Sequence, residues 1–588
     1  MSEKIWELKD EPPQEFYDEH PELPEVVARL LYHRGIRSQE EIDEFLNPDY
    51  SEDIHDPFLF GEMETAVERI FSAIDEDESI MIFGDYDADG VSAAAILDET
   101  LEALGAENLD VYLPNRETEG YGLNKGAIEV FADDNVDLII TCDCGISDKE
   151  EVEVANEHDM DVIITDHHSI PEQTPDSFAT LHPKIEEENY PDQTLSGGAV
   201  AFKLAQGLLR KDKQQDDRLE SEHSHEGFEK WLLDLVAIAN VADMVPLKGE
   251  ARTLTKHGFI VLNKTKRIGL QKLLLEASIM EEDGNMKQEI DSGTIAFQIA
   301  PRINAAGRIN HANVAYRLMV TDDEIEAIDL ADELNQNNRD RQQMVKENMQ
   351  EVERQIEEQQ DQPLLFVRGE GWKKGLTGLI ASKIKEKHHK PTIAVTYKSG
   401  EYTGSGRSIE GFNIVEALQD MDHYFSTFGG HPMACGFTLS ENDTLEDFKE
   451  DLIDKFKQET DKEDLKKKIV IDSKIKMKHV DWELYDILQQ FKPFGKGNRK
   501  PKYLAEELEV QSVKPVGSNN NHLTFMATHE KRKMHKFIGW NLCADSRDLN
   551  WADELSKGDK VDVVFDISVN EWNGNRELQF TIEDIRKA

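Results

Sequence analysis

The stretch Ser79-Ile-Met-Ile-Phe-Gly-Asp85-Tyr-Asp-Ala-Asp-Gly90 decides the fold, because an apolar run typical of a buried strand ends there in a cluster of carboxylates. Two later runs repeat the pattern: residues 136–142 end at Asp143, and residues 160–165 end at Asp166-His167-His168. Segments with helical periodicity separate the three runs, which predicts βαβ units and a parallel sheet covered by helices on both faces. The carboxyl ends of such strands form a ligand crevice, so we expect these polar side chains to meet there.

The side chains at these strand ends are mostly hard oxygen donors with one or two imidazoles. This set suits Mn²⁺ or Mg²⁺ better than Zn²⁺. Crowded carboxylates repel one another unless cations neutralise them, so we expect two metal ions about 3.5 to 4 Å apart, an arrangement that serves phosphoester cleavage. The candidate donors are Asp85, Asp87, Asp89, Asp143, Asp166, His167 and His168.

Each cluster also has a structural explanation when it is considered alone. An Asp-rich turn after a strand often caps the following helix, and a pair of histidines is more often surface or core than ligand. Three such clusters at equivalent strand ends favour one shared site over three separate structural roles.

The motifs at residues 85–90, 141–146 and 165–168 resemble, in this order, those of the DHH phosphoesterases. The Asp-Tyr-Asp-Ala-Asp-Gly form of the first motif is typical of the RecJ single-strand exonucleases, and the resemblance extends over nearly the whole chain. It implies a 5′-to-3′ exonuclease that degrades single-stranded DNA to mononucleotides in DNA repair and recombination. The alternatives are a DHH phosphoesterase acting on short oligonucleotides or small nucleotides, and a catalytically inactive binding protein. The predicted third domain, which resembles a domain that binds nucleic-acid strands, disfavours a hydrolase of short oligonucleotides. The presence of the acidic residues disfavours an inactive binding protein.

The resemblance also implies roles for individual residues. Asp243 ends a further motif, in a segment so apolar that an unpaired carboxylate would be costly there. The implied metal ligands are Asp85, Asp87, Asp89, Asp143, His167 and Asp243, with Asp166 and His168 as catalytic groups near the reacting phosphate. The residues implied to hold substrate phosphates are Arg116, Arg308, Ser405, Arg407 and His431. Their chemistry fits, since an arginine fork binds a phosphate at two points and neighbouring glycines let the backbone approach.

The net charge of −54 argues at first against a nucleic-acid substrate, because lysine and arginine supply most of the affinity for phosphates. The 120 acidic residues are spread along the chain and outnumber the 66 basic ones. This pattern indicates a halophilic protein in a high-salt cytosol, where charge repulsion is screened within about 3 Å at 1 M salt. Local basic stretches, such as residues 491–502, then become candidates for a strand path.

We expect a cytoplasmic protein without a membrane partner, because no apolar stretch approaches about 20 residues and the first residues lack a signal-peptide pattern. Two of the four cysteines, Cys142 and Cys144, flank Asp143. In an extended segment their sulfurs would point away from the face that Asp143 uses, which favours free thiols over a zinc site. The resemblance implies a single-strand-binding protein and a helicase as partners, and we expect a monomer.

The length of 588 residues favours about four domains. We expect an N-terminal helical lead (1–55), a DHH catalytic α/β domain (56–330), a connecting helix (331–362) and a smaller α/β DHH-associated domain that binds substrate (363–460). Short strands separated by turn residues at 465–588 predict a β-barrel that resembles an OB-fold. Its aromatics, among them Phe525, Phe537, Trp540 and Trp572, can stack bases, although most aromatics of a small barrel belong to its core.

Overall fold

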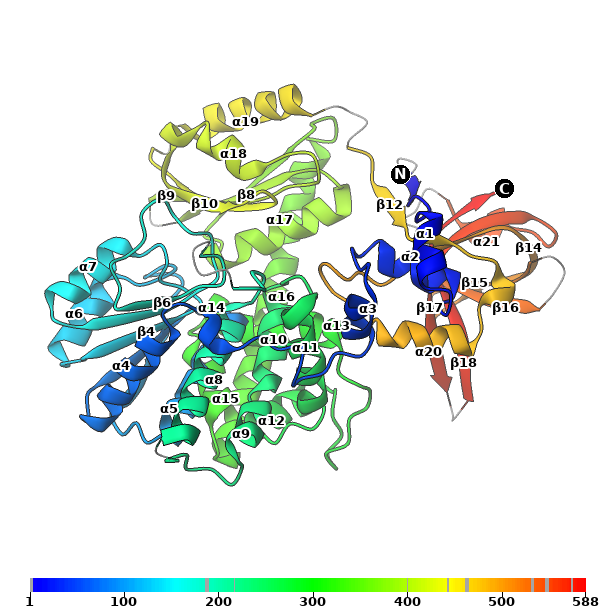
Figure 1. Cartoon of the computed structure of the whole chain (residues 1–588). Helices are drawn as coiled ribbons and strands as arrows, with labels where there is room; N and C mark the ends of the chain where they lie inside the picture. Colours follow the sequence, from blue (N-terminus) through cyan, green and yellow to red (C-terminus); the bar gives the residue numbers. More distant parts are fainter. Residues whose placement is uncertain are drawn as a thin grey trace. The chain divides into compact units, whose positions relative to one another are not determined.

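The chain folds into two compact units in the computed structural model. One unit is Tyr50–Leu465, and the other joins Met1–Asp49 to Lys466–Ala588. Figure 1 shows the elements in the colours of the sequence. The structure describes residues 4–185, 190–215, 217–398, 400–441, 444–460, 465–529, 533–544, 549–572 and 575–588.

A five-stranded parallel sheet forms the centre of the first unit, as predicted. Its strand order is β3-β2-β4-β5-β6, and each neighbouring pair is parallel. The strands are β2 (Ile80–Gly84), β3 (Leu109–Tyr112), β4 (Leu138–Cys142), β5 (Asp161–Thr165) and β6 (Ala179–Leu181). From β2 the chain moves to β3 on one side, and then to β4 on the other. The switch point of this topology, where a crevice opens, therefore lies between β2 and β4.

Helices cover both faces of this sheet, because its strands are apolar on both sides. One face packs on α4 (Met63–Asp75), α5 (Ala88–Ala103) and α8 (Gly197–Gln215). The other face packs on α6 (Lys125–Asp133) and α7 (Lys149–Glu157). Helix α6 begins where the Asn124 side chain accepts a hydrogen bond from the amide of Ala127, a common cap for exposed amides.

The short helix η1 (Pro57–Leu59) precedes α4 and contacts α4 and α8. A helical region follows α8 and packs against α5. It consists of α9 (His225–Trp231), α10 (Leu233–Ala242), α11 (Gly249–Leu262), α12 (Ile268–Glu276), α13 (Ser292–Thr294), η2 (Ile295–Ile299), α14 (Ala300–Ile309) and α15 (Asn313–Val320). The long helix expected after residue 321 is α16 (Glu324–Glu357). Because α16 packs on α12, α14 and α15, its first half belongs to the catalytic core and is more than a connector.

The second α/β layer of this unit is a five-stranded sheet in the order β10-β11-β9-β8-β7, in which only β7 and β8 pair in parallel. Its helices lie on both faces (Figure 1). Its elements are β7 (Leu365–Glu370), α17 (Lys374–His388), β8 (Thr392–Lys398), β9 (Glu401–Arg407), α18 (Ile414–Gln419), η3 (Asp422–Tyr424), β10 (Phe425–His431), β11 (Ala434–Leu439) and α19 (Leu445–Glu459). The predicted smaller α/β domain is confirmed.

The other unit contains a closed five-stranded barrel, since β14 pairs with both β15 and β17 and the ring continues through β16 and β18. The predicted OB-fold class is confirmed. The elements after residue 465 are β12 (Lys468–Ile471), β13 (Ser473–Lys474), η5 (Met477–His479), α20 (Trp482–Gln490), β14 (Tyr503–Val516), β15 (His522–Thr528), β16 (Met534–Gly539), α21 (Trp551–Glu554), β17 (Lys560–Trp572) and β18 (Asn575–Lys587).

The N-terminal segment packs on this barrel unit, which the division of the sequence into consecutive domains did not predict. Its elements are β1 (Ile5–Leu8), α1 (Gln14–Glu19), α2 (Glu25–Tyr32) and α3 (Gln39–Leu46). Strand β1 pairs in parallel with β12, and apolar residues of α2 and α3 join the barrel core.

The sequence analysis expected most aromatic residues of the barrel to lie in its core. Phe525 and Phe537 are buried in the core, whereas Trp540 is 52% exposed. The side chain of Trp572 lies outside the described residues. Within the described residues, every helix is too short or too polar to traverse a lipid bilayer.

Candidate metal centre

The predicted acidic and imidazole side chains meet at the switch point of the parallel sheet. Asp85 directly follows β2, Asp143 directly follows β4, and Asp166 directly follows β5. Asp87 and Asp89 lie in the turn that opens α5, where Asp87 accepts hydrogen bonds from the amides of Asp89 and Gly90. The helix-cap explanation is therefore correct for Asp87, but it leaves the clustering of the other carboxylates unexplained.

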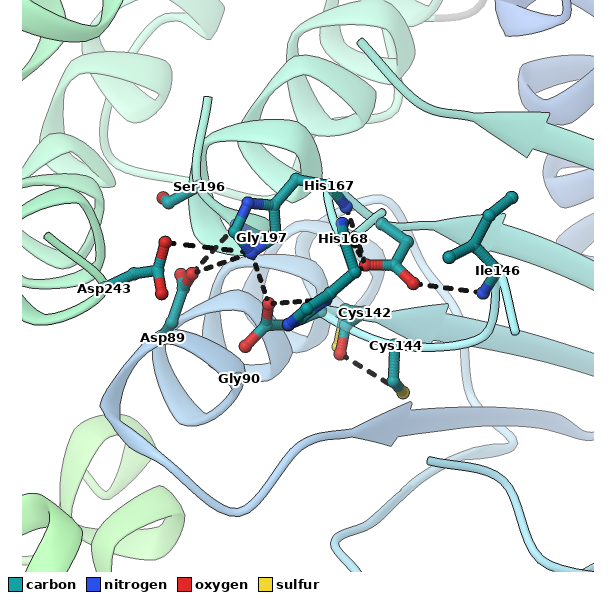
Figure 2. Close-up of polar contacts among 12 residues, drawn as sticks. Asp89, Gly90, Cys142, Cys144, Ile146, His167, His168, Ser196, Gly197 and Asp243 are labelled. Carbon is teal, nitrogen blue, oxygen red and sulfur yellow. Dashed lines mark hydrogen bonds and ion pairs between the residues drawn. The ribbon is translucent and has the colours of Figure 1, made fainter. Parts of the chain in front are cut away.

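His167 is surrounded by three carboxylates (Figure 2). Its Nε2 atom lies 3.1 Å from Asp143 Oδ1, 3.7 Å from Asp89 Oδ2 and 3.9 Å from Asp243 Oδ2. Possible ligand atoms lie within 4.8 Å of one another in three overlapping groups. The groups are Asp85 with Asp87 and Asp143, Asp89 with His167 and Asp243, and Asp143 with His167 and His168. Because Asp143 and His167 each belong to two groups, the cluster has the layout of adjoining sites.

Buried donor atoms without partners show that the cluster suits cations. Asp85 Oδ1, Asp143 Oδ1 and His167 Nε2 are buried, and none has a hydrogen-bond partner among the described residues. Buried polar atoms are normally hydrogen-bonded, so three such atoms in one cluster, two of them 3.1 Å apart, favour a cation among them. Hard carboxylate oxygens with one or two imidazoles fit Mn²⁺ or Mg²⁺.

The ionisation of the cluster leads to the same conclusion. Burial and the neighbouring charge of Asp87 raise the pKa of Asp85 to about 8. Burial and nearby carboxylates also raise the pKa values of Asp89 and Asp143 far above their usual range. Burial, with the charge of His168, lowers the pKa of His167 to about 3. Without cations the carboxylates resist ionisation, whereas His167 stays neutral and can act as a ligand.

The glycines that begin α8 allow the carboxylates to approach one another. The carboxylate of Asp89 accepts hydrogen bonds from the amides of Gly197 (2.9 Å) and Gly198 (2.7 Å). A Cβ atom on Gly197 would lie 2.4 Å from the Cβ of Asp143, so only glycine fits. The sequence analysis missed this pair, because two consecutive glycines before a helix are indistinguishable from a turn.

The backbone at Asp143 differs from the extended conformation assumed for the Cys-Asp-Cys stretch. Asp143 has a left-handed φ of 63°. The thiols of Cys142 and Cys144 are free and buried, 3.7 and 3.8 Å from the carbonyl oxygen of Phe83. Burial and the charges of neighbouring carboxylates raise the pKa of both thiols, which therefore stay protonated.

Asp166 supports His168, although the sequence analysis grouped it with the metal donors. One carboxylate oxygen accepts hydrogen bonds from the backbone amides of His167 (2.6 Å) and His168 (3.1 Å) and lies 2.8 Å from His168 Nδ1. The other oxygen accepts from the amide of Ile146 at 3.0 Å. Burial alone would raise the pKa of Asp166, but these hydrogen bonds hold it well below its usual range. Both oxygens are therefore committed to the local backbone and to His168.

Two further residues at the cluster were not predicted. The hydroxyl of Tyr121 lies 2.9 Å from His168 Nδ1 and donates to the carbonyl oxygen of Asp143 at 3.1 Å. The side chain of Asn304, in α14, accepts a hydrogen bond from the amide of Ala88 at 2.7 Å and so fixes the start of α5. Both partners are distant in sequence, 47 residues for Tyr121 and His168 and 216 for Asn304 and Ala88, so no local pattern indicates them.

Asp243 occupies a different environment from the one assumed. It is the C-cap of α10, and its side chain is 34% exposed. The argument that burial in an apolar helix demands a partner for it is therefore wrong. Its place in the cluster rests on its closeness to Asp89 and His167.

The residues expected to hold phosphates lie beside this cluster and in the second sheet. Arg116 lies over the ring of Tyr86, with 4.8 Å from its Cζ to the ring centroid, and Arg308 donates to the carbonyl oxygen of Gly375 at 2.6 Å. Ser405 and Arg407 are alternate residues of β9 and so share a face. His431, at the exposed end of β10, is opposite Ala434, which in turn is opposite Arg407. Arg116 and Arg308 thus lie near the cluster, whereas Ser405, Arg407 and His431 lie in neighbouring strands of the second sheet.

The cluster and its arginines define a class, a metal-dependent phosphoesterase of the DHH type with an associated second domain. Profiles of protein families match the chain in three places. The DHH family, N-terminal domain, matches residues 79–239, the DHHA1 domain matches residues 361–458, and the RecJ OB domain matches residues 471–584.

Curated relatives place the chain within this class. It is 35% identical over 588 residues to the single-stranded-DNA-specific exonuclease RecJ of Bacillus subtilis, covering 99% of this chain and 71% of the relative. It is 31% identical to RecJ of Escherichia coli, covering 96% of both chains. The crystal structure of RecJ in complex with Mn²⁺ from Thermus thermophilus matches with a TM-score of 0.82 and 25% identity, covering 99% of this chain and 80% of that one. The chain belongs to the RecJ family of single-stranded-DNA-specific exonucleases.

Proposed function

We propose that this protein is a metal-dependent exonuclease that degrades single-stranded DNA to mononucleotides from the 5′ end. The observation that carries the proposal is the buried cluster at the switch point, with its three unsatisfied donor atoms beside the phosphate-binding arginines. The relatives named above are single-stranded-DNA-specific exonucleases by name, and RecJ from Thermus thermophilus has been solved in complex with Mn²⁺ and with Mg²⁺.

Six residues of the cluster are proposed to hold two divalent cations, Mn²⁺ or Mg²⁺. When bound, the cations lower the pKa of a water molecule and neutralise charge on the phosphate. Asp166 and Tyr121 fix the ring of His168, so that it can hydrogen-bond to the reacting phosphate. The proposed ligands are Asp85, Asp87, Asp89, Asp143, His167 and Asp243.

A long strand is a better candidate substrate than a dinucleotide because of the barrel. An OB-fold provides an extended surface for single strands, which a hydrolase of short oligonucleotides does not need. A test is digestion of matched single- and double-stranded DNA with Mn²⁺, each labelled at one end. We expect a 5′ label to appear in mononucleotides from the outset and a 3′ label to remain on shortening strands. The reverse pattern would overturn the polarity, and equal digestion of duplex would overturn the strand preference.

Arg407→Ala is expected to weaken the preference for strands that carry a 5′ phosphate. Arg407 lies in the second sheet beside Ser405, where the terminal phosphate is proposed to be held while the first phosphodiester meets the metals. Loss of a charge-assisted hydrogen bond costs about 1.5 to 3 kcal/mol. The ratio of kcat/KM for 5′-phosphorylated and unphosphorylated strands measures the effect.

The control is Arg368→Ala, which removes an exposed arginine of β7 in the same domain. An unchanged ratio in Arg407→Ala would remove Arg407 from the terminal phosphate.

The acidic composition is proposed to be an adaptation to high salt. We expect the free energy of unfolding to rise from dilute buffer to about 1 M KCl, because salt screens repulsion between surface carboxylates. Denaturant titration at several KCl concentrations measures the free energy of unfolding. A parallel titration in sucrose separates charge screening by salt from the general stabilisation that a cosolvent excluded from the protein surface produces. A protein that is most stable in dilute buffer would show that its net charge of −54 serves another purpose.

The cellular role, partners and location of the protein are proposed from its family. A role in DNA repair and recombination, a single-strand-binding protein and a helicase as partners, and a monomeric state all belong to this proposal. The four free, buried cysteines support a reducing compartment such as the cytoplasm.

A further inference from the structure

Helix α16 carries polar side chains whose hydrogen bonds are incomplete. Asn337 is 8% exposed and Asn338 is 3% exposed, and both lie on the same helix face as Arg341 because they precede it by four and three residues. Asn337 Nδ2, Asn338 Oδ1 and Arg341 Nε are buried without a hydrogen-bond partner among the described residues. A helix that served only to join two domains would not keep such groups at its centre.

Arg341 also stands in a row of arginines that begins at the metal cluster. Burial and the charges of Arg116, Arg341 and Arg407 lower the pKa of Arg308 to about 9, whereas the charge of Asp87 opposes this shift. Burial and Arg302 lower the pKa of Arg341, and burial and Arg339 lower that of Arg302. The row thus includes arginines of α14 and α16, two helices that pack on each other and are joined by the hydrogen bond from Arg302 Nε to Asn335 Oδ1 at 3.1 Å.

None of the arginines in this row forms an ion pair with a carboxylate in the described part of the chain. This is unexpected in a protein with 120 acidic residues, in which Arg267, for example, pairs with Asp234 at 3.0 Å. Neighbouring like charges destabilise a fold unless an anion compensates them. A row of unpaired arginines flanked by unsatisfied amides therefore suits a chain of phosphates. The members of the row are Arg116, Arg302, Arg308, Arg339, Arg341 and Arg407.

We propose that Arg341, with Asn337, binds an internal phosphate of the DNA strand on α16. This rests on the proposed exonuclease function and adds a subsite to it. Arg308 and Arg407, the latter proposed for the terminal phosphate, both contact α17: Arg308 donates to the carbonyl oxygen of Gly375, and a Cβ on Gly378 would lie 2.6 Å from Arg407 Nη2, whereas Arg341 lies on α16. Arg341 therefore contacts a phosphate farther along the strand. The unsatisfied amide nitrogen of Asn337 supplies a second donor to the same anion.

The test compares Arg341→Ala with Arg354→Ala in the full-length protein, using short single strands with either a 5′ phosphate or a 5′ hydroxyl. Arg354 lies on the same helix and is exposed, so it controls for the charge change. We expect Arg341→Ala to raise KM at least about tenfold for both strands, with kcat nearly unchanged. The slope of log(1/KM) against log[salt] should also become less negative by about 0.7, the contribution of one phosphate on a single strand. Arg341→Lys should keep the wild-type slope while it restores only part of KM, because a lysine lacks the guanidinium fork.

Three results would overturn the proposal. They are a KM for Arg341→Ala equal to that of Arg354→Ala, a loss confined to 5′-phosphorylated strands, or a fall in kcat without a change in KM. The first would make Arg341 a structural residue, the second would place the terminal phosphate there, and the third would place Arg341 in the chemistry. Thermal melting of each variant confirms folding before comparison. Failure of the wild-type protein to digest single strands would instead refute the proposed function, which keeps the two claims distinguishable.

Discussion

Asp143→Asn is expected to lose turnover by at least about 100-fold, since even residues that only support a metal ligand are worth about 10- to 100-fold. Asp143 belongs to two of the three ligand groups, and its Oδ1 lies 3.1 Å from His167 Nε2. The amide keeps the shape of the side chain but removes the negative charge that holds the cations. Asparagine also tolerates the left-handed φ of 63°, so the backbone should remain in place.

Asp159→Asn is the matched control, because Asp159 is also left-handed, with a φ of 59°, and is exposed in the turn after α7. The measurements are Mn²⁺-dependent cleavage of single strands and the rise of the melting temperature with Mn²⁺. A ligand that binds only the folded state at 100 times its Kd stabilises it by about 2.7 kcal/mol. Wild type and Asp159→Asn should show this stabilisation, and Asp143→Asn should lose most of it. Normal cleavage by Asp143→Asn would remove the metal hypothesis.

Gly197→Ala is expected to lower activity by about 100-fold, although the residue has no functional group. The added methyl would lie 2.4 Å from the Cβ and 2.5 Å from Oδ1 of Asp143, so the start of α8 or Asp143 must move. That movement also disturbs the amides of Gly197 and Gly198, which orient Asp89. A displacement of about 1 Å at a catalytic site can cost about 100-fold in rate.

Gly207→Ala controls for the loss of a glycine from the same helix. A methyl there would meet the Sδ atom of Met63 at 2.7 Å, and a flexible methionine can move aside. Alanine within a helix is favoured over glycine by about 0.5 to 1 kcal/mol, so this variant should be active and no less stable. Equal values of kcat, and an equal rise of the melting temperature with Mn²⁺, in Gly197→Ala and Gly207→Ala would show that the close packing of Gly197 on Asp143 does not matter for function.

The catalytic sheet could be predicted because three of its five strands, β2, β4 and β5, are short apolar runs that end in a distinctive cluster. In a parallel sheet, sequence alone then places Asp85, Asp143 and Asp166 at one edge. The barrel was predictable for a similar reason, since turn residues mark its strands. By contrast, the packing of residues 1–49 on the barrel depends on pairing between β1 and β12, which are more than 450 residues apart. No local pattern reports such a contact.

Roles within the site were less predictable than its location. Asp166 and Asp143 look alike in sequence, each following an apolar strand, and only the hydrogen bonds to Asp166 reveal that its oxygens are already occupied. The contact of Tyr121 with His168 arises from a loop 47 residues earlier in the chain. The position of Asp243 at a helix end depends on where α10 stops, and boundaries are poorly defined by an apolar run.

Anomalous scattering from crystals soaked in Mn²⁺ tests the central claim, that the cluster binds a pair of catalytic cations. Two peaks are expected, about 3.5 to 4 Å apart. They should lie among the carboxylates of Asp85, Asp87, Asp89, Asp143 and Asp243 and the Nε2 atom of His167. Both should be lost or weakened in Asp143→Asn and retained in Asp159→Asn. Absence of any peak at the cluster in an active, Mn²⁺-saturated wild-type protein, or a single peak bound away from Asp143 and His167, would contradict the account.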